Sequence, residues 1–192
     1  MSYKSAFVVF LFIAVLGGPE TPGAEEAKDW FQEGNRLARE GQFESAVEAF
    51  RKSIQLNPGA TVVYYNLGLA LKKMKRYEDS VSALEKAVEL EPDYLDAHLA
   101  LGNVYNLMEQ WESAVAHLNL VVHRIPDDAE AHGNLGWAFY NYKIDPPFKM
   151  LTILNLRKAV RLFEDQGIAQ AADATRRILD EALAKFKMDT ND

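Results

Sequence analysis

The chain has 192 residues, of which 48% are apolar and 11% aromatic, and it contains no cysteine. These values fit one folded domain, or at most two small ones, and exclude a disordered chain, a disulfide framework and any site built on thiolates. The 28 acidic residues outnumber the 21 lysines and arginines, which gives a net charge of −7. A general nucleic-acid binder needs a concentrated basic surface, so this class is excluded as well.

The start of the chain, residues 1–24, has the composition of an export signal. Lys4 precedes an unbroken apolar run from Ala6 to Leu16, which a Gly-Gly-Pro sequence ends. A charged start, a short apolar stretch and small residues near the cut are typical of a secretory signal peptide. As a helix, the run spans roughly 17 Å, whereas a bilayer core is about 30 Å thick.

We therefore expect residues 1–24 to be a signal peptide that is removed after Ala24, and the protein to be exported to the periplasm or secreted. The mature chain is then expected to have no membrane span. The alternative is an uncleaved N-terminal segment that anchors the protein in a membrane.

The rest of the chain is built from a repeating sequence pattern. Four glycines stand at one constant interval, namely Gly34, Gly68, Gly102 and Gly136. In the first three copies a small residue follows after twelve positions (Ala46, Ser80, Ala114), a large apolar residue after sixteen (Phe50, Leu84, Leu118) and a proline after twenty-four (Pro58, Pro92, Pro126). Such a period predicts a stack of equal structural units.

Each unit has the pattern of two helices. Apolar residues spaced by three, four and seven lie on one helical face, and in the second copy they predict helices at about 62–73 and 78–90. A glycine on the first helix and a small residue on the second let the two backbones approach closely. Asp93 and Asp127 each follow a proline that ends a unit, so we expect these carboxylates to cap the next helix.

This sequence resembles the tetratricopeptide repeat (TPR) family over about residues 27–166. The resemblance implies an all-α fold, a right-handed superhelical solenoid of antiparallel helix pairs. The TPR domain is expected at 25–188, with repeats at about 27–60, 61–94, 95–128 and 129–166.

The end of the chain departs from the period. The fourth copy carries a four-residue insertion near Tyr142–Pro147, followed by a helix that runs to about Glu164. A last amphipathic helix at about 168–187 is the expected cap, because stacked repeats need a terminal unit with a polar outer face. Residues 189–192 are expected to be a disordered tail.

The sequence contains no catalytic constellation and no phosphate-binding glycine loop. His98 and His132 occupy equivalent places in adjacent repeats, but two ligands are fewer than the three or four that a zinc site needs. We interpret both as packing residues with one ring edge in solvent. We therefore expect a protein that is not an enzyme, with no catalytic residue, metal or cofactor.

The resemblance implies a scaffold that binds a protein or an extended peptide segment in the concave groove lined by the first helix of each repeat. The groove residues expected from it are Phe31, Asn35, Tyr65, Asn66, Leu69, Lys72, Leu99, Asn103, Asn106, Asn134, Trp137 and Tyr140. An asparagine amide both donates and accepts, so it can pair with an extended backbone. Arg39, Lys72 and Lys73 give one side of this lining a positive charge, and the third repeat is mostly acidic. Either this difference in charge orients a partner, or the charged residues only form solvated turns and helix faces.

Two alternatives bear on the function. The carboxylate clamp of heat-shock co-chaperones has cations at the places occupied here by Phe31, Asp96 and Ala100, so we reject that assignment. The predicted groove residues could instead contact only the neighbouring repeat or the cap. In that case the protein is a structural accessory subunit that acts through its convex face. The first interpretation is an exported, non-enzymatic scaffold at an envelope complex.

Overall fold

The chain forms a row of helices. A computed structural model describes residues 22–142 and 148–187 and shows them as nine α-helices without a strand. In chain order they are α1 (Pro22–Arg39), α2 (Phe43–Leu56), α3 (Thr61–Lys73), α4 (Tyr77–Leu90), α5 (Leu95–Leu107), α6 (Trp111–Arg124), α7 (Ala129–Asn141), α8 (Phe148–Asp165) and α9 (Ala169–Phe186). The helices predicted at 62–73, 78–90 and 168–187 are confirmed to within one residue at each end.

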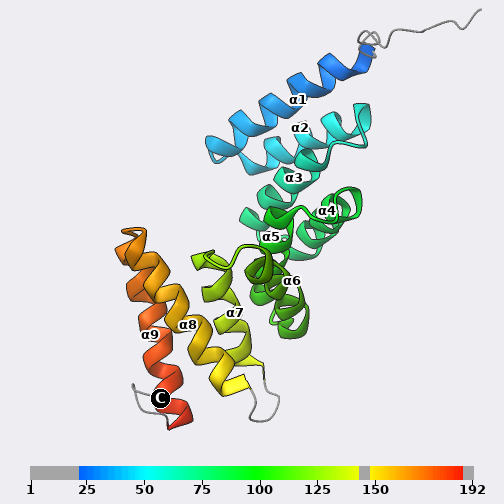
Figure 1. Cartoon of the computed structure of the whole chain (residues 1–192). Coiled ribbons are helices and arrows are strands. Elements are labelled where there is room, and N and C mark those ends of the chain that lie inside the picture. Colours follow the sequence, from blue (N-terminus) through cyan, green and yellow to red (C-terminus); the bar gives the residue numbers. More distant parts are fainter. Residues whose placement is uncertain (1–21, 143–147, 188–192) are drawn as a thin grey trace, which may run out of the picture.

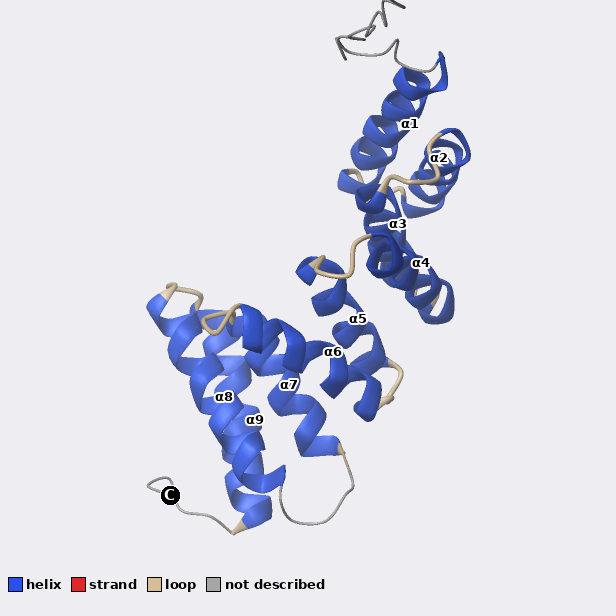
Figure 2. Cartoon of the chain, turned by 45° about the vertical axis from the view of Figure 1, so that its right-hand side comes forward, coloured by secondary structure: helices blue, strands red, loops and turns tan. Residues whose placement is uncertain are grey.

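Successive helices pack into an elongated stack. Each helix contacts the next one, and α1, α3, α5 and α7 also contact one another in that order. The first and last helices lie at opposite ends of the stack (Figure 1). A second view shows α7, α8 and α9 gathered at one end, α1 to α4 at the other, and α5 and α6 between them (Figure 2). The predicted all-α stack of helix pairs is therefore confirmed.

The periodic glycines stand where the two helices of a repeat are closest. A Cβ atom built on Gly102 lies 2.4 Å from Leu118 Cγ, and the same construction gives 2.5–2.7 Å at the other three positions: Gly34 with Phe50, Gly68 with Leu84, and Gly136 with Leu156. The partner is thus the large apolar residue of the second helix. The small residue also lies at this contact, since Ser80 Oγ donates to the carbonyl of Gly68 at 2.7 Å.

The turn inside each repeat has a left-handed residue at the same place. φ is 78° at Gly41, 60° at Lys75 and 58° at Glu109, three positions related by the interval of the periodic glycines. The turn between α8 and α9 repeats this geometry at Gly167, where φ is 72°. Helices α8 and α9 are therefore joined by a turn of the type found inside a repeat, and this explains how α9 closes the stack.

The predicted caps at Asp93 and Asp127 are wrong. The residues that cap α5 and α7 are the next ones along the chain, Tyr94 without a side-chain bond and Asp128, whose carboxylate accepts from the backbone N–H of Ala131 at 2.7 Å. Pro92 and Pro126 are each followed by one more turn residue than we expected before the next helix begins. Asp93 and Asp127 instead form exposed ion pairs with the following repeat, to Arg124 at 2.9 Å and Lys158 at 3.0 Å.

Several predictions fall outside the described residues. They concern most of the leader at 1–24, the insertion residues 143–147 and the tail at 189–192. Helix α1 begins at Pro22, before the expected cut after Ala24, and its first buried residue is Ala27. Across 22–142 and 148–187, no helix combines the length and the apolar character that a membrane crossing requires.

Candidate functional site

The first helices of the four repeats form one continuous surface, which we call the first-helix face. It consists of α1, α3, α5 and α7, whose neighbours in this order touch (Figure 1). All twelve residues predicted for a groove lie on these helices. Each of their side chains is partly exposed except that of Asn106, which is buried. Eleven of the twelve predicted residues are therefore partly exposed on the first helices, and Asn106 is the exception.

Two asparagine pairs join neighbouring repeats on this face. Asn66 Nδ2 donates to Asn35 Oδ1 at 2.8 Å, and Asn134 Nδ2 donates to Asn103 Oδ1 at 2.5 Å. Within each pair the two residues are 31 positions apart. Between the second and third repeats the same two places hold Leu69 and Ala100. The asparagine pairs thus link the first repeat to the second and the third to the fourth, and each side-chain amide keeps a donor or acceptor that its partner does not use.

The expectation that Asn106 lines a groove is wrong. Its side chain is only 8% exposed, and its Nδ2 donates to the backbone carbonyl of Asn134 at 3.0 Å. Because this bond runs from α5 to α7, the side chain of Asn106 lies against α7. Its Oδ1 has no hydrogen-bond partner among the described residues. A buried acceptor without a partner costs about 1–3 kcal/mol, so the amide is held there by its packing and by its one donated bond.

A pocket of about 480 Å³ opens between α1 and α3. We call it the α1–α3 pocket; its lining residues are Asn35, Ala38, Arg39, Phe43, Phe50, Asn66, Leu69, Ala70 and Lys73. Its floor is apolar, the first asparagine pair forms part of its wall, and its two charged lining residues are both cations. Arg39 and Lys73 are exposed, and neither has a carboxylate partner among the described residues. Arg39 Nε donates to the carbonyl of Asn35 at 3.1 Å, which holds the guanidinium near the pocket.

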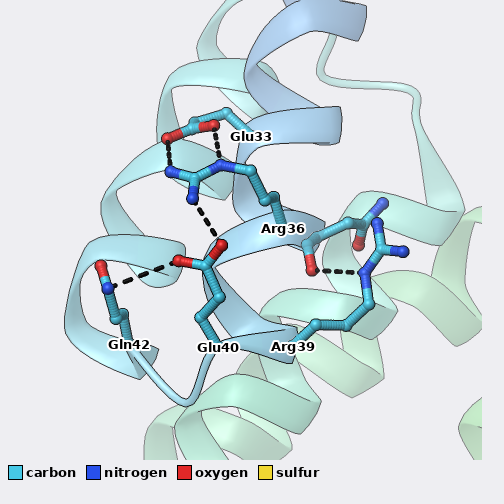
Figure 3. A network of polar contacts seen from close by, with 6 residues as sticks. Glu33, Arg36, Arg39, Glu40 and Gln42 are labelled. Atoms are coloured by element: carbon cyan, nitrogen blue, oxygen red, sulfur yellow. Dashed lines mark hydrogen bonds and ion pairs between the residues drawn. The ribbon is translucent and has the colours of Figure 1, made fainter.

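A separate ionic network occupies another side of α1. Arg36 donates to Glu33 at 2.9 Å and to Glu40 at 2.6 Å. The hydrogen bond from Arg36 outweighs burial and lowers the pKa of Glu33 below its ordinary value. Figure 3 shows these three residues together and Arg39 extending away from them. Arg39 therefore makes no ion pair with the carboxylates of its own helix.

Two carboxylates, those of Asp96 and Glu130, influence residues in the middle of the first-helix face. Glu130 accepts a bond from Asn103 Nδ2 at 2.8 Å. Burial raises the pKa of Tyr65, and the charges of Asp96 and Glu130 add to the rise. Burial lowers the pKa of Lys72, and the charge of Glu130 opposes this change. Glu130, near the start of α7, thus acts electrostatically on two residues of α3.

His98 and His132 each pair with a residue of their own repeat, and they do not pair with each other. His98 Nε2 donates to the carbonyl of Pro92 at 3.0 Å, and its Nδ1 lies 2.9 Å from Nδ1 of His117. His132 has the same arrangement with Asn155, at 2.7 Å. No group of three His, Asp or Glu side chains within the described ranges is placed to hold a metal ion. His98 is buried with both ring nitrogens bonded inside the protein, so the expected solvent-facing ring edge is wrong for His98, whereas His132 is partly exposed.

Comparison with known proteins accounts for the repeats. A family model described as "Tetratricopeptide repeat" matches residues 71–136, and one described as "TPR repeat" matches residues 34–75. The chain belongs to the tetratricopeptide repeat family. A search of curated protein sequences finds no match to it.

Solved TPR structures share this fold. MamA (41-end) from Desulfovibrio magneticus RS-1 has a TM-score of 0.67 at 22% identity, over 84% of this chain and 93% of that one. The first TPR of Spaghetti (RPAP3) bound to the HSP90 peptide SRMEEVD has a TM-score of 0.59 at 22% identity, over 60% of this chain and 91% of that one. The second TPR domain of human RPAP3, in complex with the HSP70 peptide SGPTIEEVD, has a TM-score of 0.56 at 22% identity, over 60% and 94%. Identities this low establish the fold alone.

The C-terminal cap of the TPR stack covers one end of the first-helix face. The ring of Tyr140 packs edge-on against Phe186 of α9 at 6.1 Å, and Lys185 Nζ lies 4.0 Å above the same ring. Trp137 lies beside Tyr140 at 5.9 Å between ring centroids and stays partly exposed. Of these two predicted groove residues, Tyr140 therefore belongs to the packing of the cap, whereas Trp137 is accessible next to it.

Two groups of site residues were not predicted from the sequence. Glu130 was not among the predicted site residues but accepts a bond from Asn103, 27 positions earlier. Lys185 and Phe186 were assigned to the cap alone but contact Tyr140. No local pattern marks these contacts, because the path of the superhelix decides which residues of distant repeats meet.

Proposed function

We propose that this TPR protein is a non-catalytic interaction module that binds an extended segment of a partner protein along its first-helix face. The α1–α3 pocket carries the proposal, because it joins an apolar floor to amides and cations on an accessible surface. Such a pocket suits an apolar side chain of a bound segment, and the amides suit its backbone. TPR neighbours that are named with HSP90 and HSP70 peptides support a peptide as the ligand class.

The proposal does not include the carboxylate clamp. Its cation places hold Phe31, Asp96 and Ala100. Phe31 packs on Phe50 with ring centroids 6.2 Å apart, and Ala100 is 4% exposed. Asp96 is an exposed carboxylate that repels a terminal carboxylate. The peptides of the RPAP3 structures therefore indicate a kind of ligand, and not its sequence.

We also propose that the protein is exported and acts in the periplasm or at an envelope complex. The charged start and the apolar run from Ala6 to Leu16 support this. A chain that begins at Glu25 retains the buried part of α1, which starts at Ala27. The intact mass of protein purified from its native cells tests the proposal, since a mass that includes residues 1–24 in the membrane fraction favours the anchor instead.

Site-specific photo-crosslinking tests the binding face. A photoreactive amino acid replaces Leu69 or Leu99 on the first-helix face, or the exposed controls Glu48 on α2 and Ser82 on α4. The full chain is irradiated in the cells that produce it, and crosslinked proteins are identified by mass spectrometry. We expect one partner to be captured from both first-helix positions and from neither control. Capture of that partner from Glu48 and Ser82 alone would place binding on the second helices.

A structural role through the second helices is the other candidate. α9 already covers Tyr140, and Met150, Leu151 and Leu154 of α8 are 40–53% exposed. Exposed apolar residues grouped on one helix are common at protein interfaces. Crosslinks from Leu154 to a stable partner, without any from Leu69, would favour this role over peptide binding.

A further inference from the structure

The two cations at the α1–α3 pocket lack the neutralisation that many other cations in this protein have. Arg36, Arg76, Arg124, Lys158 and Arg176 each have a carboxylate within 3.0 Å among the described residues. Arg39 and Lys73 have none there, although acidic residues outnumber basic ones in the chain. The lining of the pocket contains no Asp or Glu. Two cations without an ion-pair partner therefore stand at the mouth of an apolar pocket, and Arg39 also borders a second hollow that Asp29 and Glu33 line.

The middle of the same face has the opposite character. Glu130 of α7 accepts a hydrogen bond from Asn103 of α5 at 2.8 Å, and Asp96 is an exposed carboxylate on α5. Acceptors thus gather on α5 and α7, whereas free cations gather on α1 and α3. The first-helix face thus carries unpaired cations toward α1 and carboxylates toward α7.

We infer that the α1–α3 pocket anchors a segment in which an aspartate or glutamate stands beside an aliphatic or aromatic residue. The apolar side chain lies on the floor formed by Phe43, Phe50 and Leu69, and the carboxylate lies between Arg39 and Lys73. The basic or N–H-rich part of the segment points toward Glu130. This inference rests on the proposed function and adds to it the chemistry and the direction of the bound segment.

Physical complementarity supports this occupant over others. The pocket has a volume of about 480 Å³, which lies in the range of small-ligand sites, about 300–1,000 Å³. A purely apolar segment leaves both cations without a counter-charge, and a basic segment is repelled by them. Complementary charges orient a partner and suppress wrong ones. The acidic–apolar combination is the one that uses the floor and both cations together.

A displayed library of random dodecapeptides tests the inference on the full chain. Bound peptides are sequenced for the wild type, for the pocket variant Arg39→Glu/Lys73→Glu and for the control Arg51→Glu/Arg177→Glu. The control changes the total charge equally at two exposed arginines outside the pocket. Peptides selected by the wild type are then synthesised and titrated by fluorescence anisotropy.

We expect the wild type and the control to select Asp or Glu beside Leu, Ile or Phe. The pocket variant should bind these peptides about tenfold more weakly or worse and select Lys or Arg at the same place. Wild-type binding should weaken as salt is added. Circular dichroism confirms that all three proteins are folded.

The outcomes separate this inference from the proposed function. Peptides that bind the pocket variant as tightly as the wild type, but lose affinity when Leu69 is changed to Glu, refute the acidic anchor and retain the binding face. If no peptide is selected, or if the selected peptides ignore both changes, the inference and the proposed function fail together.

Discussion

Replacing Gly102 by alanine should destabilise the protein, although alanine favours helices. The added Cβ lies 2.4, 2.7 and 3.1 Å from the three branched carbons of Leu118. Leu118 is fully buried, so it has no solvent to move into. Carbon atoms in optimal contact are about 3.5–4.0 Å apart. Relief of this clash therefore requires α5 and α6 to separate or Leu118 to leave its rotamer.

The net effect is a balance of two terms. Overpacking a core costs typically about 1–3 kcal/mol, and alanine in place of a mid-helix glycine gains about 0.5–1 kcal/mol. For Gly102→Ala we expect the free energy of unfolding to fall by about 0.5–2 kcal/mol, because both carbon–carbon distances below 3.0 Å involve a buried side chain.

Gly133 supplies a matched control on α7. A Cβ built there finds its nearest neighbour, Ala159 Cβ, at 3.7 Å, which is an ordinary contact. Gly133→Ala should therefore keep the helix-propensity gain and raise the free energy of unfolding by up to about 1 kcal/mol. The two substitutions are chemically identical and differ in the space around the new methyl group.

Urea unfolding followed by circular dichroism measures both changes. The midpoint should fall for Gly102→Ala and rise for Gly133→Ala at similar m-values. In a Leu118→Ala background the cost of Gly102→Ala should vanish, since the atoms that clash are gone. Equal shifts for the two glycine variants would refute the close approach of α5 and α6 at Gly102.

Two further predictions concern a turn and the cap. Lys75→Gly should raise the free energy of unfolding by about 0.5–1 kcal/mol, because Lys75 has φ of 60° where Gly41 stands in the first repeat. Thermal melts of Lys75→Gly and Lys75→Ala check this, and an equal gain from alanine contradicts it. Tyr140→Ala should loosen α9 by about 1–3 kcal/mol, since it removes the ring against Phe186 and under Lys185. Hydrogen exchange should then accelerate in α9 but not in α1, and unchanged protection of α9 would contradict the contact.

The sequence predicted the scaffold well because each repeat solves the same packing problem. Gly102 and Leu118 are 16 positions apart, and the same spacing recurs at Gly34 with Phe50 and at Gly68 with Leu84. Contacts within one helix pair depend on short separations along the chain, so the regular recurrence of the same residue types reveals them. The helix bounds follow for the same reason.

Contacts between repeats were predicted less well. The spacing predicted that Asn35 and Asn66 share a face, but not that they bond to each other. The burial of Asn106 under α7 depends on how far the third and fourth repeats rotate against each other. The failed caps at Asp93 and Asp127 have a smaller cause, since a shift of one residue in the helix start removes a carboxylate from its capping position.

The part-buried pair of His98 and His117 predicts a loss of stability in acid. His98 Nε2 donates to a carbonyl, so in the neutral ring its Nδ1 accepts from the Nδ1–H of His117. Around this bond, Tyr105 of α5 stacks on His117 at 5.6 Å and donates to Glu85 of α4. Two protonated rings would place N–H against N–H, so the bond does not survive double protonation.

The sign of the effect follows from the pKa of His117. Burial, and then His98, lower the pKa of His117 below its ordinary value, and Glu85 only partly opposes this. Between the folded pKa and the unfolded value of about 6.5 the unfolded chain binds more protons. The contribution of His117 to the free energy of unfolding is therefore complete above about pH 6.5. It is lost as the pH drops through that value toward the pKa of His117 in the folded protein.

His117→Asn provides the test, because repeat four already has Asn155 at the equivalent place, bonded to His132 at 2.7 Å. The variant should keep a hydrogen bond to His98 without a titrating second ring. Urea midpoints measured at about pH 7.5 and about pH 5.5 should fall more for the wild type than for His117→Asn. The control His123→Asn removes an exposed histidine from the same helix and should behave as the wild type does. If His117→Asn loses as much stability in acid as the wild type, His117 is not the group that causes the loss.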